Sequence, residues 1–413
     1  MISLLRIEVS PTKDLVAEAT PTPGTTGSAE PPPAPEPPAT TGSTHGLDGL
    51  AILIGHAPGG EEVRWNLDRT MSPPLPNFGL LVSGDAGQGK TQIIKAVLAE
   101  AMAAGSPVLV FDFKNDYGGD FASEHGLDVY DLARGVPFNP LRLPPKGKSG
   151  TQAIYHVLEF VGILQSCLHL GEQQKAMLRE AVITSFEGLG VPLREWVDPD
   201  ETPAPSFSQI VEIIEGVGDS KSAALLNRLA QLHLLDLLPG DAESRLTFDE
   251  LVSRRAVLSF HNLPSDDGLK RALAELMLVQ VQAHMLRGDQ PRALRRLLVF
   301  DEAWRASDSN RLISIAREGR AFGAGIVAGS QFADDLASEL TGNLATRIHL
   351  FNSDADRRRK IVQSTYGSAS STEAKAMLRE LQDLAPFDAV IRNQHFTPFE
   401  SVRVLPYFER KGS

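Results

Sequence analysis

The chain has 413 residues, of which 42% are hydrophobic and 22% are charged, a composition typical of a soluble, folded protein. Its formal net charge at pH 7 is −12, which argues against a protein with a basic surface throughout. Any contact with nucleic acid must therefore come from local groups of lysine and arginine.

The sequence predicts a cytoplasmic protein with no membrane span of its own. The single cysteine, Cys167, cannot form an internal disulfide, and its apolar neighbours predict a thiol packed in the core of a protein from a reducing compartment. Near the N-terminus, Arg6 and Glu8 interrupt a short apolar run, which does not suit a signal peptide. No later run approaches the length of about 18 apolar residues that crosses a bilayer.

The N-terminal part of the chain differs from the rest. Residues 1–18 begin with a strand-like alternation and form a predicted stub, and residues 19–46 are dominated by Pro, Thr, Gly, Ala and Ser. Such a composition buries too little apolar surface to order itself, so we expect a flexible linker. A stub before a tether suggests that the chain is the C-terminal part of a longer polypeptide.

After the linker the pattern changes to that of a strand, loop and helix unit. A buried strand leads directly into a glycine-rich turn, and apolar residues spaced at three and four positions predict a helix after it. A second continuous apolar run is typical of a strand covered on both faces. The predicted elements are short strands at 51–54 and 62–65, the strands 78–82 and 108–111, and the helix 92–103.

Three later apolar runs, at 257–260, 297–300 and 325–328, repeat the pattern of a doubly covered strand. Between them and the first unit, residues 151–250 follow helical periods. We therefore expect an α/β fold with a parallel or mixed central sheet flanked by helices and an all-helical insertion.

Residues 84–91 read GDAGQGKT and match G-x-x-x-x-G-K-[ST] at every fixed position. Phosphates need a concave row of backbone N–H groups, which glycine-rich backbone forms without steric cost, and the following helix adds its positive end. Lys90 is expected to reach the β- and γ-phosphates of ATP, and Thr91 to ligate Mg²⁺. The residues expected to hold the phosphates are Gly84, Asp85, Ala86, Gly87, Gln88, Gly89, Lys90 and Thr91.

A later buried strand is expected to end in two carboxylates, Asp301 and Glu302. Hydrolysis of ATP needs a second partner for the magnesium and a group that orients water. Asp301 is expected to hold the water shell of Mg²⁺, and Glu302 to align the attacking water. A strand-end Asp–Glu pair is also common as a cap, but the phosphate loop in the same chain favours the catalytic interpretation.

Arg317, Arg320 and Gln331 follow in the segment REGRAFGAGIVAGSQ. Phosphoryl transfer builds negative charge, which an arginine from a neighbouring subunit can neutralise. Arg320 is the expected trans arginine and Arg317 a second candidate, while Gln331 is placed to sense the γ-phosphate. The alternatives are a solvated helix end paired with Glu318 for the arginines and an ordinary loop position for the glutamine.

The blocks GDAGQGKT, VLVFDFKNDY, PFNPL, LLVFDEAW, REGRAFGAGIVAGSQ and NLATRIHL together resemble the HerA/FtsK superfamily, which includes the type IV secretion and conjugation ATPases. The resemblance implies a RecA-like P-loop core, in two parts on either side of the insertion, and usually a homo-hexameric ring. Such rings move or remodel double-stranded DNA with ATP and Mg²⁺. The implied division is a first core part at 47–150, the insertion at 151–250, a second core part at 251–405 and a tail at 406–413.

The same resemblance assigns Arg320 to the trans arginine finger. It also aligns Asp112 and Lys114 with an Asp and a Lys found after the second core strand of the superfamily. For this pair a purely structural role stays open, because Asp112 can serve simply to cap its loop.

Within the superfamily, the segments AILIGHAPGGEEVRWNL and PLPNFGLLVSGDAGQGKT, together with the tethered stub, resemble the C-terminal ATPase region of DptH-type proteins. Those proteins act in phosphorothioation-dependent restriction of foreign DNA. This resemblance rests on the general similarity of these segments rather than on a motif exclusive to DptH-type proteins. It implies antiviral defence with a partner nuclease.

Lys146 and Lys148, in a Pro/Gly loop, are the preferred candidates for DNA contact, because a ring multiplies each pore cation by the number of subunits. Other candidates are Arg292, Arg295, Arg296 and 357–360, all of which are equally compatible with solvated surface. Three functions remain open: a DNA-translocating or DNA-remodelling motor, an ATPase that energises secretion or conjugation, and an ATP-gated ring scaffold for nucleases.

Overall fold

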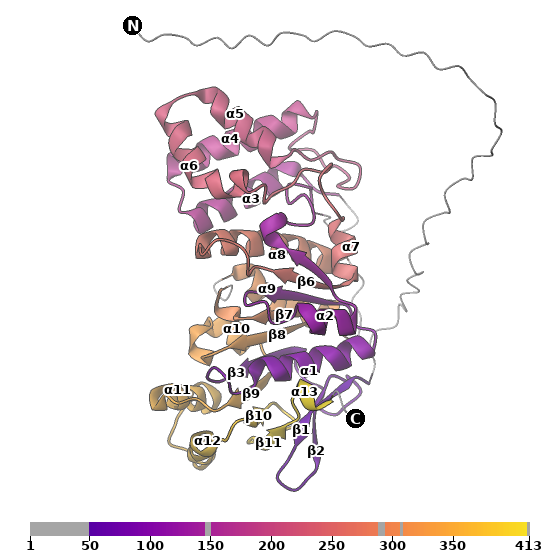
Figure 1. The fold of residues 1–413 in the computed structure, drawn as a ribbon, viewed down its shortest axis with the longest axis vertical. Coiled ribbons are helices and arrows are strands. Elements are labelled where there is room, and N and C mark those ends of the chain that lie inside the picture. The colour runs from indigo at the N-terminus through magenta and orange to yellow at the C-terminus, as the bar shows by residue number, and fades with distance from the viewer. Residues whose placement is uncertain (1–48, 145–149, 288–293, 306–308, 411–413) are drawn as a thin grey trace, which may run out of the picture. The chain divides into compact units, whose positions relative to one another are not determined.

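The structure is a computed structural model that describes residues 49–144, 150–287, 294–305 and 309–410. The predicted stub at 1–18, the linker at 19–46, and Lys146 and Lys148 lie outside these ranges. Within them, one eleven-stranded sheet has the order β2-β1-β11-β10-β9-β3-β8-β7-β4-β6-β5 (Figure 1). The strands are β1 (Ala51–His56), β2 (Glu62–Asn66), β3 (Gly79–Ser83), β4 (Val108–Asp112), β5 (Asp128–Asp131), β6 (Arg255–Ser259), β7 (Arg296–Asp301), β8 (Ala324–Ser330), β9 (Thr346–Leu350), β10 (Asp388–Arg392) and β11 (Glu400–Val404).

The sheet has a parallel part and an antiparallel part. From β9 to β5 all neighbouring strands run parallel, whereas β10, β11, β1 and β2 are joined antiparallel. Every residue of β3, β4 and β8 is buried, as their continuous apolar sequences predict. The predicted fold class, a mostly parallel α/β sheet flanked by helices, is confirmed.

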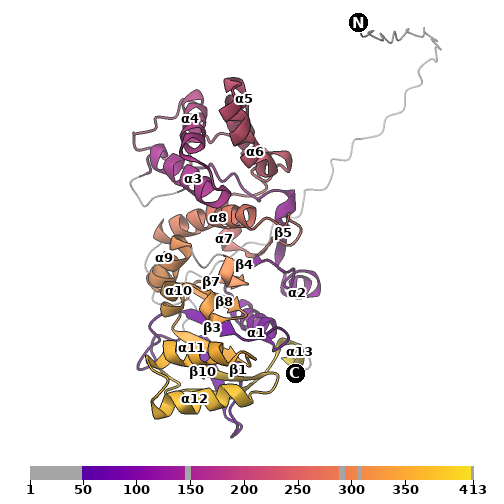
Figure 2. The same cartoon turned by 90° about the vertical axis from the view of Figure 1, so that its left-hand side faces the viewer.

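Helices cover both faces of the parallel part (Figures 1 and 2). Alternate residues of one strand belong to different clusters: Leu80 and Val82 pack with α1 (Lys90–Ala103), whereas Leu81 packs in the cluster of α8 (Asp267–Arg287). Helices on the α1 side are α2 (Gly119–His125) and α13 (Tyr407–Arg410), and on the α8 side α9 (Asn310–Glu318) and α10 (Ser338–Gly342). Near β10 lie α11 (Ala355–Tyr366) and α12 (Thr372–Asp383).

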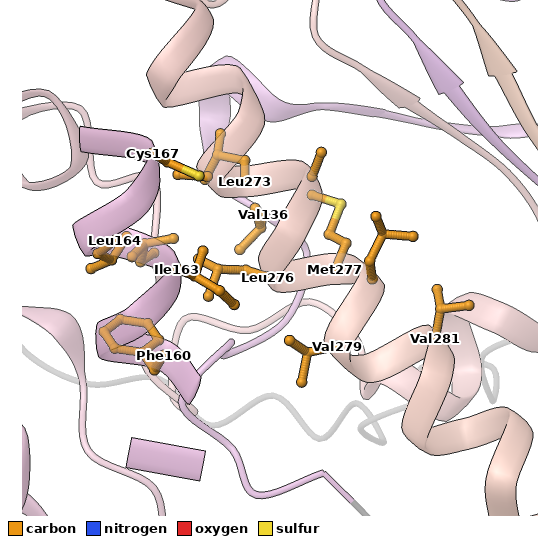
Figure 3. Close-up of a cluster of buried hydrophobic side chains, with 14 of the residues drawn as sticks. Val136, Phe160, Ile163, Leu164, Cys167, Leu273, Leu276, Met277, Val279 and Val281 are labelled. Carbon is orange, nitrogen blue, oxygen red and sulfur yellow. The ribbon is translucent and has the colours of Figure 1, made fainter. Parts of the chain in front are cut away.

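The stretch predicted to be helical carries α3 (Ala153–Leu168), α4 (Glu172–Gly188), α5 (Phe207–Val217), α6 (Ser220–Leu234) and α7 (Phe248–Ser253). Helix α8 separates α3 to α6 from the sheet (Figure 1). Figure 3 shows Phe160, Leu164 and Cys167 of α3 near Leu273 and Leu276 of α8, in one buried cluster. Short 3₁₀ helices complete the described elements: η1 (Leu132–Arg134), η2 (Ala303–Arg305), η3 (Gly319–Phe322) and η4 (Ala333–Asp335).

The packed thiol predicted for Cys167 is confirmed, since the residue is buried and burial raises the pKa of the thiol to about 11. Among the helices of the described ranges, none combines the length and the apolar character needed to cross a membrane.

Two histidines of the described residues are buried, His156 on α3 and His349 on β9. Burial lowers the pKa of His156 to about 4 and that of His349 to about 3, because the charged imidazolium loses its hydration. The unfolded chain takes up these protons near pH 6.5, whereas the folded chain does so only near pH 4 or 3. Stability is therefore lost as the pH falls below about 6.5, by at most about 1.4 kcal/mol per pH unit and histidine.

We accordingly expect a lower Tm at pH 5 than at pH 7, measured by thermal unfolding. In His156→Gln the difference between the two Tm values should shrink, because one of the two protonation differences is gone. The matched control is His261→Gln, which removes an exposed histidine. An unchanged difference in His156→Gln would show that the buried imidazole does not govern the acid response.

Candidate active site

The segment GDAGQGKT forms the turn between β3 and α1, at the carboxyl edge of the parallel strands. Gly84, Gly87 and Gly89 have φ values of 152°, 80° and 109°, which disfavour side-chain-bearing residues. At two of these positions, Gly84 and Gly89, neighbouring atoms also leave no room for a side chain. A Cβ on Gly84 would lie 2.6 Å from the Cβ of Leu350, and one on Gly89 would lie 2.7 Å from the ring of Phe387.

Lys90 is the first residue of α1, and its side chain folds back over the turn. Its Nζ donates hydrogen bonds to the carbonyl oxygens of Gly84, at 2.7 Å, and Asp85, at 3.0 Å. Burial lowers the pKa of Lys90, while the charges of Asp301 and Glu302 oppose that shift. The turn is thus spanned by a cation held close to two carboxylates.

These features fit the phosphate groups of a nucleotide. The first turn of α1 contains no acidic residue and has no side-chain cap, so its backbone N–H groups and positive dipole end can face an anion. Because neighbouring atoms leave no room for a side chain at Gly84 or Gly89, the backbone forms the surface of the turn at these positions. The residue predictions for the phosphate loop are consistent with this geometry.

Thr91 and Asp301 come from different elements and meet at the same edge. The Thr91 hydroxyl donates to Oδ2 of Asp301 at 3.2 Å. Hydroxyl and carboxylate oxygens are the ligands that Mg²⁺ prefers, so this pair fits the metal that accompanies a nucleotide. Among the described residues, no cluster of three or more His, Cys, Asp or Glu side chains offers a site for a metal held by protein alone.

Asp301 is the last residue of β7 and is almost completely buried. Burial raises its pKa, and hydrogen bonds from Tyr117 and Thr91 oppose the shift. The Tyr117 hydroxyl donates to Oδ2 at 3.0 Å, and the backbone N–H of Glu302 donates to Oδ1 at 3.1 Å. On its other side, a Cβ on Gly329 would lie 2.7 Å from Oδ1.

Glu302 follows with a left-handed backbone, at φ 65°. Its side chain is only 6% exposed and forms an ion pair with Lys114, whose side chain is 47% exposed. The charge of Lys114 also contributes to lowering the pKa of Lys90, which places both lysines within electrostatic reach of one another. Lys114 therefore belongs to the same group of charges as the phosphate loop.

Asp112 ends β4 and organises the turn that carries Lys114. Its Oδ1 accepts hydrogen bonds from the backbone N–H groups of Lys114 and Asp116, both at 3.1 Å, and its Oδ2 accepts one from that of Tyr117, at 2.9 Å. Burial raises the pKa of Asp112, and these hydrogen bonds oppose that shift. Of the two interpretations left open for Asp112, these contacts match the loop cap.

Gln331 and Asp85 tie the phosphate loop to the neighbouring strands. The carbonyl of Gln331 accepts a hydrogen bond from the N–H of Gly84 at 3.2 Å, so the segment after β8 lies directly beside the loop. Asp85 accepts a hydrogen bond from the N–H of Ser353 through its Oδ2, at 2.8 Å, and donates its own N–H to Phe351, at 2.9 Å. The loop therefore contacts the ends of both strands that flank β3.

The two predicted arginines lie at the opposite edge of the sheet. Arg320, in η3 before β8, donates through Nη1 to the carbonyl of Pro76 at 2.6 Å, and Pro76 precedes β3. Arg317 forms an exposed ion pair with Glu318 at 3.2 Å. The seven residues of β8 separate this edge from the phosphate loop, which corresponds to about 20 Å. Neither arginine is brought to Lys90 of its own chain.

The basic residues considered for DNA contact differ in their surroundings. Lys146, Lys148 and Arg292 lie outside the described residues. Arg296 is partly buried, and burial lowers its pKa to about 10. The cluster at 357–360 is largely paired with acids, since Arg357 contacts Asp334 and Asp335, Lys360 contacts Asp334, and Arg359 contacts Asp356.

Two functional candidates emerge from contacts rather than from motifs. Tyr117 closes the block VLVFDFKNDY, but no role was predicted for it; its burial against Asp301 appears only in the folded chain. Lys114 was expected only through resemblance, and its ion pair with Glu302 was not foreseen.

No protein-family model matches the chain, and no curated protein matches its sequence. Solved structures share its fold. The structure of VirB4 of Thermoanaerobacter pseudethanolicus is 18% identical, with a TM-score of 0.70 over 87% of this chain and 97% of that one. The bacterial conjugative coupling protein TrwBdeltaN70 is 16% identical, with a TM-score of 0.54 over 86% of this chain and 88% of that one.

Another structure, of the plasmid coupling protein TrwB in complex with ADP and Mg²⁺, is 16% identical, with a TM-score of 0.52 over 79% of this chain and 85% of that one. At these identities the similarity concerns the fold. It extends over most of each chain.

Proposed function

We propose that this chain is an ATPase of the HerA/FtsK type that uses ATP and Mg²⁺ to translocate or remodel double-stranded DNA. The observation that carries the proposal is the convergence of Lys90, Thr91, Asp301 and Glu302 at the carboxyl edge of one parallel sheet. The fold shared with TrwB, one structure of which contains ADP and Mg²⁺, supports the choice of nucleotide and metal.

In this proposal each residue has a distinct task. The backbone N–H groups of the phosphate loop bind phosphate oxygens, and Lys90 exchanges its carbonyl partners for the β- and γ-phosphates. Thr91 and Asp301 hold Mg²⁺, which neutralises charge on the phosphates when bound. Glu302 orients a water molecule and accepts its proton. Gln331, beside Gly84, senses the γ-phosphate.

A ring of identical subunits, which we propose to be a hexamer, would complete this site. Arg320 lies about 20 Å from the phosphate loop of its own chain, so it can serve only the site of a neighbour. At that position a guanidinium stabilises the charge that develops during transfer. Lys146 and Lys148 remain our candidates for DNA contact in the ring.

A second candidate function is an ATPase that energises a secretion or conjugation machine. The specific observation in its favour is the fold similarity to VirB4 and to the conjugative coupling protein. Co-purification of this chain with a membrane channel would favour this function over the DNA motor. A more specific version of the motor proposal is a role in phosphorothioation-dependent defence with a nuclease partner. It rests on the sequence segments that resemble DptH-type proteins.

The test of the motor is ATP turnover of the purified protein with and without duplex DNA. We expect duplex DNA to stimulate turnover, and we expect Glu302→Gln to lower it by about 10²-fold or more while ATP still binds, because the amide cannot accept a proton. The control is Glu187→Gln, which changes an exposed carboxylate on α4.

The same variant distinguishes the motor from an ATP-gated scaffold. A scaffold that needs only ATP binding would keep its biological activity in Glu302→Gln, whereas a motor would lose it. Wild-type protein that hydrolyses ATP but does not respond to any DNA would contradict the DNA-motor proposal.

A further inference from the structure

The loop that follows β4 contacts both carboxylates of the proposed active site. Asp112 fixes its shape by accepting three backbone hydrogen bonds, from Lys114, Asp116 and Tyr117. The loop then places Lys114 against Glu302 and Tyr117 against Asp301. One short segment thus contacts both the proposed metal ligand and the proposed base.

The Lys114–Glu302 ion pair can rearrange more easily than the Tyr117–Asp301 hydrogen bond. Lys114 is about half exposed, so its flexible side chain can exchange Glu302 for solvent or another anion. Tyr117 is fully buried, and its ring packs edge-on against Phe121 with centroids 6.0 Å apart. The tyrosine hydroxyl is therefore held in place by packing, whereas the lysine is not.

The carboxylate of Asp301 is constrained on both oxygens. The N–H of Glu302 occupies Oδ1, and the close approach of Gly329 restricts the space beside it. Oδ2 accepts from both Thr91 and Tyr117, at 3.2 and 3.0 Å. A carboxylate oxygen has two lone-pair directions. The Tyr117 hydroxyl takes one of them, and the other faces Thr91 at the phosphate loop.

We propose that Tyr117 is a positioning residue that holds Asp301 in the orientation required for Mg²⁺ at the nucleotide site. The inference rests on the proposed ATPase function and extends it to a residue for which the sequence motifs predict no role. Hydrogen-bond partners behind a metal ligand fix its orientation, and their loss typically lowers metal affinity by about 10–100-fold. The Tyr117 hydroxyl donates its hydrogen bond to Asp301, so we expect its effect to act through that carboxylate.

The test is Tyr117→Phe, which removes only the hydroxyl from a side chain of the same shape. The readout is binding of a fluorescent ADP analogue at increasing Mg²⁺, with the metal-free affinity measured in EDTA. We expect the Mg²⁺ concentration for half-maximal effect to rise by about 10-fold or more, with the metal-free affinity unchanged. Binding of Mn²⁺, followed by its paramagnetic resonance spectrum, should weaken in parallel.

The control is Tyr366→Phe, which also removes one hydroxyl hydrogen bond, to the carbonyl of Pro398 at 2.9 Å on the surface. It should leave the Mg²⁺ dependence unchanged. An unshifted Mg²⁺ dependence in Tyr117→Phe would overturn the inference, and so would a loss of metal-free binding accompanied by a lower Tm, which would indicate a general structural role. Failure of the wild-type protein to bind nucleotide in any condition would instead contradict the proposed function.

Discussion

Lys90→Ala is expected to abolish ATP turnover, with a loss of at least about 10²–10³-fold. Lys90 is the buried cation of the phosphate loop, and its Nζ already lies within hydrogen-bonding distance of two loop carbonyls, those of Gly84 and Asp85. Alanine removes the charge that would contact the β- and γ-phosphates.

Release of phosphate measures this loss, and equilibrium binding of labelled ATP shows whether affinity falls with it. The control is Lys221→Ala, which removes an exposed lysine from α6. Turnover at the wild-type rate in Lys90→Ala would exclude the proposed site.

Arg320→Ala is expected to lower turnover by about 10³-fold without preventing ATP binding. The arginine lies at the amino edge of the sheet, against the carbonyl of Pro76, and cannot reach the phosphate loop of its own chain. Its proposed contribution is to the charge that develops during transfer in a neighbouring subunit. Arg317→Ala is the matched comparison, and we expect a smaller effect because that side chain is exposed and paired with Glu318.

A mixing experiment tests whether the arginine acts between subunits. Lys90→Ala retains Arg320, and Arg320→Ala retains Lys90, so each variant supplies what the other lacks. Rings assembled from both should regain part of the ATP turnover that neither shows alone. If Arg320→Ala alone keeps normal turnover, the residue is not part of the site; if mixing restores nothing, action between subunits is not supported.

The strands predicted from a continuous apolar run are those that helices cover on both faces. The runs before Gly84, Asp301 and Gln331 are apolar throughout because helices cover both faces of β3, β7 and β8. Strand β9 escaped prediction because its sequence, TRIHL, includes Arg347 and His349, whose burial depends on partners elsewhere in the chain. His349, for example, pairs with the hydroxyl of Ser83 on β3 at 2.7 Å.

Helix α8 is an example of a helix that the sequence pattern does not predict. It is the longest helix in the described ranges, but it is buried on almost all sides, between the sheet and α3, so it lacks the one-sided apolar stripe that identifies a surface helix. In contrast, the helix predicted at 92–103 is α1, and it begins only two residues earlier, at Lys90.

The active-site motifs were predictable because the chemistry requires particular residue types at fixed spacing, as in the phosphate loop and at Asp301 and Glu302. The supporting contacts were not. Tyr117 and Asp301 are far apart in the chain, and only the parallel pairing of β4 with β7, which aligns Asp112 with Asp301, brings them together. Sequence spacing therefore gives no signal of this contact.

The antiparallel end of the sheet has a consequence for biosynthesis. Strand β1 forms near the start of the described chain, but its inner neighbour is β11, with Gly55 paired to Val404. On α13, Arg410 donates to the carbonyl of Leu53, 357 residues earlier. On a ribosome, the edge of β1 that faces β11 therefore stays without a partner until β11 has been synthesised. A stop codon just before β11 would leave one edge of β1 and one edge of β10 without a partner strand, which exposes both edges to aggregation.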